Sequence, residues 1–396
     1  MVAGYAAKEF VKQGIEPGEL CIVSADDTAP YKRPPLSKGF LAGDEDLDDI
    51  LISSPDFYFS HGIKLQLNTW ITHADFEAKA LQRRSGEAIT YDRLLIATGA
   101  WPRDLKVVEG QVEGIFYLRN VGHARDIHQY AHQAERAVVV GSGFIGMEVS
   151  SVLAEQDIET TLVFMDDQVM NGVFTAEMAD YFQTYYQQRG VRLMPSSRVQ
   201  SCDSTNSDIS VALDVGEEIG TDMVVVGIGV YPEVSCLAKT ELDTSDGVAA
   251  NEYLETAIPD VYVAGDVARY HDVVSERVRR FEHEDNARHQ GKHVARVMLG
   301  RREPFVHVPY FYSDMFDLSW EYWGDQAGAD RVIYRGEPAG GSFSTWWLQG
   351  SRVVAAFVLN RPHEEGKIAE QWIKSRQQVD SSLLREEDRS LADAQV

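Results

Sequence analysis

Short apolar runs that lead into glycine recur along the chain and predict buried strands. The clearest run, residues 137–140, passes through Gly141-Ser142-Gly143-Phe144-Ile145-Gly146 into a helical pattern. Residues 91–99 and 222–229 are two further apolar runs that also end in glycine. Each half of the chain therefore carries one copy of the same α/β plan for binding a nucleotide.

The glycine-rich turn has the spacing of a dinucleotide site. Gly141 would permit the tight turn, Gly143 would let a pyrophosphate approach the backbone, and Gly146 would let helix and strand pack closely. The helix N-terminus then offers N–H groups to the phosphates. Asp166 follows the next strand, where an acid binds a ribose hydroxyl. The alternative is an ordinary buried strand followed by a glycine-rich turn.

The first residues predict part of a second fingerprint. Residues 2–11 have helical spacing, and a short apolar strand and Asp26 follow. The interval from Gly4 to Asp26 resembles that from Gly146 to Asp166. We therefore expect the opening strand and the first two glycines to precede this sequence; the alternative is that the helix is the true N-terminus.

The last quarter of the chain differs in composition. From about residue 304 it is rich in Tyr, Trp and Phe, and the alternation of residues 342–348 and 352–359 predicts strands of a smaller α+β domain. Residues 283–299, before this change, predict a helix. Beyond about Ser381 the chain is polar and acidic, and we expect a frayed end.

Composition places the chain among soluble globular proteins. It has 396 residues, 44% of them hydrophobic and 25% charged. No apolar run approaches the ~18 residues of a membrane span, and no secretory signal pattern is visible. The three cysteines, Cys21, Cys202 and Cys236, lie far apart, which favours a reducing compartment. We expect a cytoplasmic location.

The net charge of −25 disfavours nucleic acid and anionic membranes as partners. An anionic ligand must therefore meet a local cluster of cations. The candidates lie in the proline-bracketed loop 29–38 and in the segment 277–280, namely Arg33, Lys38, Arg277, Arg279 and Arg280. Taken alone, these side chains are more typical of solvated surface charges.

Several segments together point to one family. Four are general to it: residues 4–7 (Gly-Tyr-Ala-Ala), the loop 29–38, Ala97-Thr98-Gly99 and Ala264-Gly265-Asp266. Three are more specific: residues 279–283 (Arg-Arg-Phe-Glu-His), 309–313 (Pro-Tyr-Phe-Tyr-Ser) and 316–320 (Phe-Asp-Leu-Ser-Trp). From Val2 to about Gln378 the chain resembles the FAD-dependent pyridine-nucleotide reductases of glutathione-reductase-like fold. It is most similar to monodehydroascorbate reductases, with rubredoxin and ferredoxin reductases as close relatives.

The resemblance implies two Rossmann-like domains, one for FAD and one for NAD, and a small C-terminal α+β domain. The FAD domain would comprise residues 1–120, lacking its first strand, and residues 241–303. The NAD domain would comprise residues 121–240. The C-terminal domain would comprise residues 304–380, followed by a polar tail at 381–396.

The cofactors implied are FAD and NADH, and no metal site is expected. The resemblance assigns cofactor contacts to Gly4, Asp26, Arg33, Lys38, Ile71, Ala97, Thr98, Gly99, Arg119, Asn120, Gly141, Gly143, Phe144, Ile145, Gly146, Glu148, Asp166, Gly229, Gly265, Asp266 and Glu284. Taken alone, Asp266 reads equally well as a helix N-cap.

The resemblance also implies the catalytic residues. Glu282 and His283 would lie beside the nicotinamide, at a helix N-terminus that stabilises negative charge on the flavin. Arg288 and Tyr312 would form the acceptor site. The alternatives are a capping or surface role for His283 and an i,i+4 ion pair between Arg288 and Glu284.

The expected reaction passes a hydride from NADH to FAD and electrons on to an external acceptor. Residues 33–38 contain no cysteine, unlike the corresponding stretch of disulfide reductases. The most similar family implies the monodehydroascorbate radical. Gly172 stands where an arginine is expected, which disfavours NADPH as the electron donor. Asp314 replaces another arginine, as in ferredoxin reductases. The alternatives are a ferredoxin-like or rubredoxin-like carrier as partner, or a non-catalytic NAD-sensing flavoprotein like the apoptosis-inducing factors.

Overall fold

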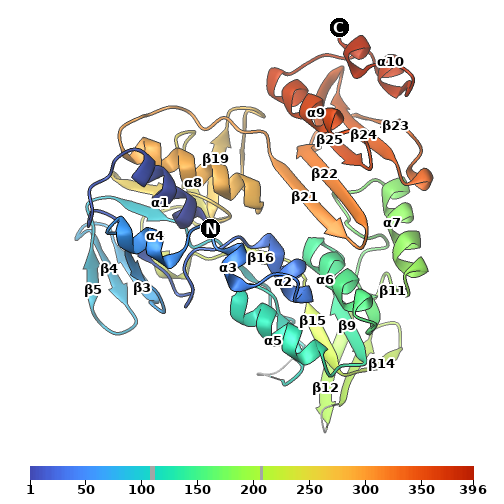
Figure 1. Cartoon of the computed structure of the whole chain (residues 1–396), viewed down its shortest axis with the longest axis horizontal. Helices are drawn as coiled ribbons and strands as arrows, with labels where there is room; N and C mark the ends of the chain where they lie inside the picture. The colour runs from blue at the N-terminus through green and yellow to red at the C-terminus, as the bar shows by residue number, and fades with distance from the viewer. Residues whose placement is uncertain (108–111, 206–207) are drawn as a thin grey trace. The chain divides into compact units, whose positions relative to one another are not determined.

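The computed structural model describes residues 1–107, 112–205 and 208–396, which divide into two compact units (Figure 1). Unit 1 comprises Met1–Arg33, Asp46–Trp101 and Tyr231–Pro309. Unit 2 comprises Pro34–Glu45, Pro102–Val230 and Tyr310–Val396. Two short strands, β7 (Ala100–Pro102) and β16 (Val230–Pro232), contain residues at which the chain leaves one unit for the other.

Unit 1 combines short parallel and antiparallel sheets with four helices of the described chain: α1 (Val2–Lys12), α3 (Leu47–Ile50), α4 (Pro55–Ser60) and α8 (Glu284–Met298). The parallel pairs are β1 (Cys21–Val23) with β2 (Lys64–Gln66) and β6 (Leu94–Ile96) with β18 (Val261–Val263). An antiparallel sheet contains β3 (Ile71–Asp75), β4 (Ala80–Arg83) and β5 (Ala88–Thr90). A mixed sheet contains β17 (Val248–Ala250), β19 (Ala268–Asp272) and β20 (Arg277–Arg279), and η2 (Ser235–Leu237) is a 3₁₀ turn.

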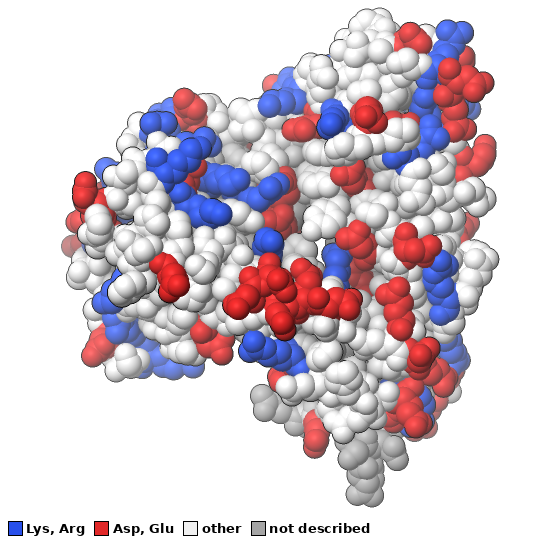
Figure 2. Space-filling model, in the orientation of Figure 1, with Lys and Arg blue, Asp and Glu red and all other residues white. Residues whose placement is uncertain are grey.

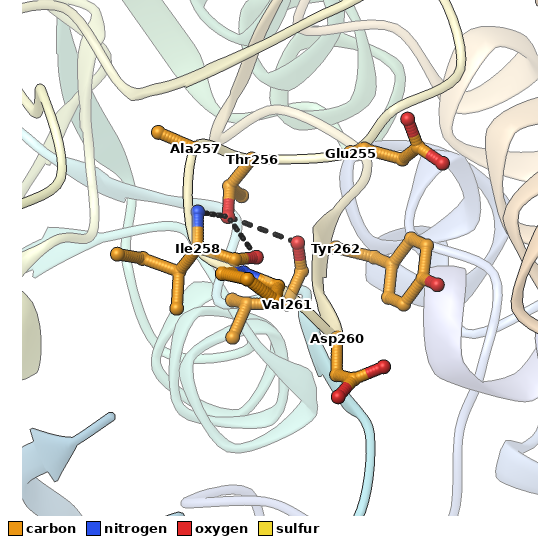
Figure 3. Close-up of a pocket in the computed structure, with 8 residues that line it drawn as sticks. Glu255, Thr256, Ala257, Ile258, Asp260, Val261 and Tyr262 are labelled. Atoms are coloured by element: carbon orange, nitrogen blue, oxygen red, sulfur yellow. Dashed lines mark hydrogen bonds between the residues drawn. The ribbon is translucent and has the colours of Figure 1, made fainter. Parts of the chain in front are cut away.

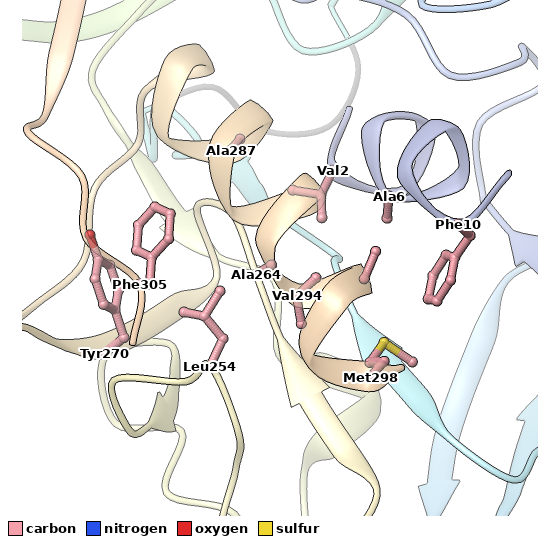
Figure 4. Close-up of a cluster of buried hydrophobic side chains, with 11 residues drawn as sticks. Val2, Ala6, Phe10, Leu254, Ala264, Tyr270, Ala287, Val294, Met298 and Phe305 are labelled. Atoms are coloured by element: carbon pink, nitrogen blue, oxygen red, sulfur yellow. The ribbon is translucent and has the colours of Figure 1, made fainter. Parts of the chain in front are cut away.

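The core of unit 1 forms where α1 packs on α8 (Figure 4). Val2 and Phe10 of α1 share one buried cluster with Val294 and Met298 of α8. Each such side chain contributes about 1.5–3 kcal/mol on full burial. A Cβ on Gly291 of α8 would lie 2.7 Å from the carbonyl oxygen of Val2, so glycine permits this close approach.

The two helices predicted in this unit are confirmed as α1 and α8. The sequence of α8 suits both of its ends, because Glu284 and Asp285 lie in the first turn and Arg296 lies in the last. Acids near the N-terminus and a cation near the C-terminus each interact favourably with the helix dipole.

Unit 2 contains a five-stranded parallel sheet in the order β11-β10-β9-β15-β8. The strands are β8 (Ile115–Tyr117), β9 (Arg136–Val140), β10 (Glu159–Val163), β11 (Arg192–Met194) and β15 (Met223–Val226), with α5 (Val121–Ala131), α6 (Phe144–Glu155) and α7 (Ala176–Gln188) between them in the chain. The apolar runs at 137–140 and 223–226 are buried because they form the inner strands β9 and β15.

A small antiparallel sheet and one short segment also belong to the first part of unit 2. The strands β12 (Val199–Thr205), β13 (Asp208–Leu213) and β14 (Glu218–Thr221) pair antiparallel. Residues 206 and 207 lie outside the described residues. The segment of η1 (Pro34–Ser37) and α2 (Gly39–Ala42) also belongs to this unit.

The C-terminal part of unit 2 is an antiparallel sheet in the order β21-β22-β25-β24-β23. Its strands are β21 (Tyr310–Met315), β22 (Leu318–Gly324), β23 (Arg331–Arg335), β24 (Phe343–Gln349) and β25 (Arg352–Leu359). Helix α9 (His363–Ser375) packs on β22 and β25, and η3 (Pro338–Gly340) links β23 to β24. Trp320, Trp346, Phe357 and Trp372 are almost fully buried, which explains the aromatic composition of this segment.

The end of the chain folds against β23, so the expectation of a frayed tail is wrong. The short helices α10 (Ser381–Arg385) and η4 (Leu391–Ala394) bury Leu384 and Leu391. The guanidinium of Arg335, which is buried on β23, donates to the carbonyl oxygens of Leu384, Glu386, Glu387 and Arg389. Backbone carbonyl groups, which every residue provides, thus add four hydrogen bonds to the contacts of the two buried leucines.

Replacing Arg335 with leucine should release this end of the chain. Its four acceptors lose a charged donor, and each hydrogen bond to a charged group is worth ~1.5–3 kcal/mol. We expect Arg335→Leu to lower the free energy of unfolding by at least about 3 kcal/mol. Hydrogen exchange should accelerate across residues 381–396.

Arg331→Ala is the matched control, because Arg331 is exposed on the same strand and makes one hydrogen bond to Ser381, at 3.2 Å. Its cost should stay near 0.5 kcal/mol, roughly the range of surface substitutions. Slow exchange of the tail in Arg335→Leu would contradict the role given to this side chain.

Candidate functional site

The predicted dinucleotide turn lies between β9 and α6 in unit 2. A Cβ on Gly141, whose φ is +104°, would lie 2.4 Å from the carbonyl oxygen of Gly227. A Cβ on Gly146 would lie 1.7 Å from the carbonyl oxygen of Gly141. Neither position accommodates a side chain. A Cβ on Gly143, by contrast, would meet no described atom within 4 Å, so the backbone is open to a ligand there.

The start of α6 and Asp166 complete this arrangement. Gly143 is the N-cap of α6, and no side chain of the described residues caps the helix. Its first N–H groups can therefore bind phosphate oxygens, which the helix dipole favours. The exposed carboxylate of Asp166 follows β10 and accepts a hydrogen bond from Nδ2 of Asn171 at 2.8 Å. Turn, helix terminus and acid together fit a dinucleotide with a free ribose hydroxyl.

Three other residues predicted for this site also belong to unit 2. The ring of Phe144 lies 5.0 Å from that of Phe311, centroid to centroid, whereas Ile145 is exposed. The carbonyl oxygen of Gly229, after β15, accepts a hydrogen bond from the N–H of Arg103 at 2.9 Å. Their contacts with a cofactor stay predictions.

Glu148 of α6 is buried and binds donors from three segments of unit 2. Its Oε1 accepts hydrogen bonds from Nζ of Lys38 at 2.6 Å and from Oγ of Ser313 at 2.5 Å, and its Oε2 accepts one from Ser37. Nζ of Lys38 also lies 5.5 Å from the ring centre of Tyr312. The structure thus brings together three predicted residues, Lys38, Glu148 and Tyr312. Sequence reasoning missed Ser37 and Ser313, because a serine carries no signal without its partner.

In unit 1, two predicted segments meet at one edge of the β6–β18 pair. Residues 97–99 follow β6, and Gly265 and Asp266 follow the parallel strand β18. The N–H of Gly265 donates to Oε1 of Gln290 at 2.6 Å, and the hydroxyl of Thr98 donates to the carbonyl oxygen of Glu233 at 2.5 Å. The carboxyl ends of parallel strands are where ligands of α/β folds bind. A strand, β19, follows Asp266, so its alternative as a helix N-cap is wrong.

The predicted residues near the start of the chain gather around Tyr31. Its hydroxyl donates to Oδ2 of Asp26 at 2.6 Å, and the guanidinium of Arg33 lies 5.5 Å from its ring centre. A Cβ on Gly4 would lie 2.7 Å from Cβ of Pro30, in the same loop, so α1 packs closely on it. The loop that holds Asp26 and Arg33 is therefore fixed against α1.

The remaining predicted cofactor residues are more scattered. Ile71 is the first residue of β3 in unit 1, whereas Arg119 precedes α5 in unit 2. Asn120 caps α5, since its side-chain oxygen accepts the N–H of His123 at 2.8 Å. Their roles stay predictions.

The start of α8 holds three predicted residues. His283 is the N-cap of α8, but its side chain makes no capping hydrogen bond. Burial lowers the pKa of His283 to about 4, so its imidazole is neutral at neutral pH. Burial also raises the pKa of Glu284, whereas the exposed Glu282 pairs with Arg280 at 2.5 Å. A neutral imidazole and a helix N-terminus are suited to a ring that becomes negatively charged.

Arg288 forms its ion pair with Asp285 rather than with Glu284, which corrects the alternative drawn from the sequence. Arg288 binds Oδ1 of the buried Asp285, while Nε2 of His307 and Nδ1 of His289 lie 2.7 and 3.2 Å from Oδ2. Burial raises the pKa of Asp285, but these three neighbours outweigh it and hold that pKa well below its usual range. The i,i+4 spacing of Asp285 and His289 was a signal in the sequence; the approach of His307 was not.

Arg288 also begins a cationic stripe, which we define as Arg288, Lys292 and Arg296 of α8 and Lys8 of α1. Their four-residue spacing places the α8 members on one face of the helix. Figure 2 shows Lys and Arg side chains gathered over α1 and α8. Desolvation and the positive charges of Arg288 and Lys8 lower the pKa of Lys292. The stripe offers local positive charge on a chain of net charge −25.

The other suggested cation cluster is largely offset by acids. Arg280 pairs with Asp246 at 3.0 Å as well as with Glu282, and Arg279 lies 3.4 Å from Asp272. This segment therefore presents less unbalanced charge than its sequence suggests.

A small pocket in unit 1 does not gather catalytic groups (Figure 3). Residues 255–262 of a single loop line it. The hydroxyl of Thr256 bonds to the carbonyl oxygens of Ile258 and Val261 at 3.3 and 2.9 Å, so this group serves the conformation of the loop itself. Glu255 and Asp260 are engaged by Arg302 and Lys79.

Comparison with known families settles the class of protein. Residues 2–291 match the family described as pyridine nucleotide-disulphide oxidoreductase. The chain belongs to this family. Residues 310–395 match a second family, described as reductase C-terminal. The predicted α/β fold with a C-terminal domain is confirmed, and the protein is an NADH-dependent FAD oxidoreductase.

Individual relatives agree with this assignment. A monodehydroascorbate reductase of Pisum sativum is 35% identical over 98% of this chain and 96% of its own length. The seedling isozyme of Cucumis sativus is 34% identical over 98% of this chain and 95% of its own length. The solved complex of putidaredoxin reductase with putidaredoxin matches with a TM-score of 0.95 and 29% identity, covering 99% of this chain and 95% of that one. The resemblance read from the sequence is confirmed.

Among the described residues, no helix has both the length and the apolar character needed to cross a bilayer.

The exposed Asp166 should set the choice between NADH and NADPH. Its carboxylate can accept a hydrogen bond from a 2′-hydroxyl and repels a 2′-phosphate, and Gly172 supplies no cation. We expect kcat/KM for NADH to exceed that for NADPH by at least about tenfold, which requires only ~1.4 kcal/mol. Asp166→Ala should bring the two values within about threefold of each other.

Asp167→Ala is the control, because Asp167 is the exposed acid next in the chain. It should leave the preference unchanged. Equal values for both nucleotides in the unaltered enzyme would remove Asp166 from this role.

Proposed function

We propose that this enzyme reduces the monodehydroascorbate radical with electrons from NADH. The observation that carries the proposal is the set of relatives named monodehydroascorbate reductase, which match almost the whole chain at 32–35% identity. Residues 33–38 hold no cysteine, so the electrons would leave for an external acceptor.

The residues at the start of α8 would serve the two halves of the reaction. Bound FAD supplies the redox chemistry, accepting a hydride from NADH and releasing electrons to the acceptor. Glu282 and the neutral His283 would orient the nicotinamide, and the N-terminus of α8 would stabilise negative charge on the flavin. Asp166 and the turn at Gly143 would hold NADH through its ribose and phosphates.

Arg288 would bind the anionic acceptor. Its side chain is 37% exposed while Asp285 holds it from within, so its direction is set and its charge remains accessible. Lys292 adds positive potential beside it. Tyr312, whose ring lies near Lys38 in unit 2, would also take part in turnover of the acceptor.

Turnover with different acceptors tests the function. NADH oxidation by the FAD-loaded enzyme is measured with monodehydroascorbate generated by ascorbate oxidase, with a panel of acidic ferredoxins and rubredoxins, and without acceptor. We expect the radical to give the highest kcat/KM. Fast turnover with a carrier protein alone would favour the second candidate, and slow turnover with every acceptor would favour a sensing role.

The second candidate is a reductase of an acidic carrier protein. The cationic stripe of Lys8, Arg288, Lys292 and Arg296 favours it, because such a surface steers and orients an acidic partner despite a net charge of −25. The solved ferredoxin reductase of the CYP199A2 system from Rhodopseudomonas palustris is 28% identical, with a TM-score of 0.93. In this case turnover should fall steeply with salt.

We also propose a cytoplasmic location, which the three dispersed cysteines support. Some matched relatives are named as peroxisomal, so imaging of the tagged protein in its native cell is the test.

Arg288→Ala should separate the two half-reactions. Loss of a charged hydrogen bond of ~1.5–3 kcal/mol should lower kcat/KM for monodehydroascorbate about ten- to a hundredfold. Flavin reduction by NADH, followed by stopped flow, should barely change. Tyr312→Phe should have a smaller effect, because only one hydroxyl is lost.

Arg296→Ala is the matched control, two turns further along the same face of α8 and 3.9 Å from Glu9. It should change turnover of the radical less than about threefold, since it would not contact the small acceptor. A large effect of both variants on turnover with an acidic carrier protein would favour that partner, which covers more of the stripe. Equal slowing of both half-reactions by Arg288→Ala would contradict the acceptor assignment.

A further inference from the structure

We propose that Asp285, His289 and His307 form a binding site for a divalent transition metal ion such as Zn²⁺. The donor atoms are one carboxylate oxygen and two imidazole nitrogens, and they lie within 4.8 Å of one another. All three residues belong to unit 1, two on α8 and one in the segment before β21. The proposal does not depend on which acceptor the enzyme reduces.

The helix α8 supplies two of the three ligands in a suitable register. Asp285 and His289 are four residues apart and therefore lie on the same face. Zinc sites commonly take two ligands at this spacing from one helix. The rings of His289 and His307 stack, with centroids 4.3 Å apart and planes 25° from parallel. Both imidazoles thus approach the same oxygen, Oδ2 of Asp285.

The distances suit a small metal ion. Zn²⁺ binds nitrogen and oxygen ligands at ~2.0–2.2 Å, so ligand atoms in a tetrahedral site are about 3.3 Å apart. Nδ1 of His289 lies 3.2 Å from Oδ2 of Asp285, and Nε2 of His307 lies 2.7 Å from it. Of these two distances, the second must widen by about half an ångström. The nitrogen atoms of the two histidines lie within 4.8 Å of each other and must also approach to about 3.3 Å where they exceed it.

The buried Nε2 of His307 is the most direct indication of a ligand. It makes no hydrogen bond with any described residue, although Oδ2 of Asp285 is within hydrogen-bond distance. A ring nitrogen and a carboxylate oxygen that approach in this way can direct their lone pairs at a common cation. A buried nitrogen that lies this close to a carboxylate oxygen and yet lacks the geometry of a hydrogen bond calls for an explanation.

Arg288 leaves the metal position accessible. It binds Oδ1 of Asp285, whereas both histidines approach Oδ2. Arg288 would therefore orient the carboxylate from outside, as partners behind metal ligands commonly do. Nδ1 of His289 also lies 2.9 Å from the carbonyl oxygen of Asp285, so metal binding requires the tautomer that is protonated on Nε2.

The donor set also selects the class of ion. Two imidazoles and one carboxylate favour Zn²⁺ and its transition-metal neighbours, whereas Mg²⁺ and Ca²⁺ prefer oxygen ligands. The side chain of His289 is 40% exposed and gives the ion a path from solvent. With three protein ligands, the fourth position would hold water.

Metal binding by the FAD-loaded, tag-free enzyme tests the proposal. After treatment with EDTA, the protein is dialysed against Zn²⁺, and bound zinc is counted by atomic emission. We expect one equivalent per chain, an X-ray absorption spectrum at the zinc edge that shows two imidazole ligands, and no retention of Mg²⁺. His289→Gln and His307→Gln should each weaken zinc binding by at least about tenfold, the lower limit for loss of a group behind a metal ligand.

His363→Gln is the matched control, because His363 is exposed on α9 in unit 2. It should retain the bound equivalent. Flavin content and circular dichroism establish that each variant is folded. If His307→Gln does not fold, zinc binding by His289→Gln, at a half-exposed position, is the test. Failure of the unaltered enzyme to retain zinc, or equal retention by all variants, would overturn the proposal.

Discussion

The carboxylate of Glu148 is the constraint on which the site in unit 2 depends. It is buried, so its charge must be matched by donors, and Ser37, Lys38 and Ser313 supply them. Removing one partner of such a buried pair typically costs ~3–5 kcal/mol. The segment Pro34–Glu45 is flanked in the chain by parts of unit 1 but belongs to unit 2. Glu148 supplies a strong physical reason for that placement and, through Lys38, for the position of the cation beside Tyr312.

A second buried carboxylate organises α8 in unit 1. Asp285 is matched by Arg288 on one oxygen and approached by two histidines on the other. The geometry fixes the base of the Arg288 side chain while its exposed part stays available to an anion. A cation held this way loses less conformational freedom on binding than a free surface arginine, which has about 2 kcal/mol of rotamer entropy. The same carboxylate thus serves both the proposed acceptor site and the proposed metal site.

The sequence predicted those features that depend on neighbours in the chain. The turn at Gly141, Gly143 and Gly146 and the helix α8 are of this kind, because their geometry follows from local spacing. Features that depend on partners far along the chain were missed. No local pattern links Ser313 to Glu148 or His307 to Asp285. Arg335 is buried against backbone carbonyl groups of a tail whose polar composition predicts no fixed structure. Backbone carbonyl groups are the same in every sequence, so their role as acceptors leaves no trace in composition.

The negative net charge of the chain determines which local clusters of cations can attract an anion. A protein of net charge −25 repels anions at long range, so cations matter most where they are concentrated and their acidic partners are buried. Arg279 and Arg280 fail this condition, because acids nearby offset them. Arg288 meets it, because its partner Asp285 is buried and Lys292 follows one turn later. An anion that approaches α8 therefore meets positive charge at its surface, while the negative charge that orients Arg288 lies behind it.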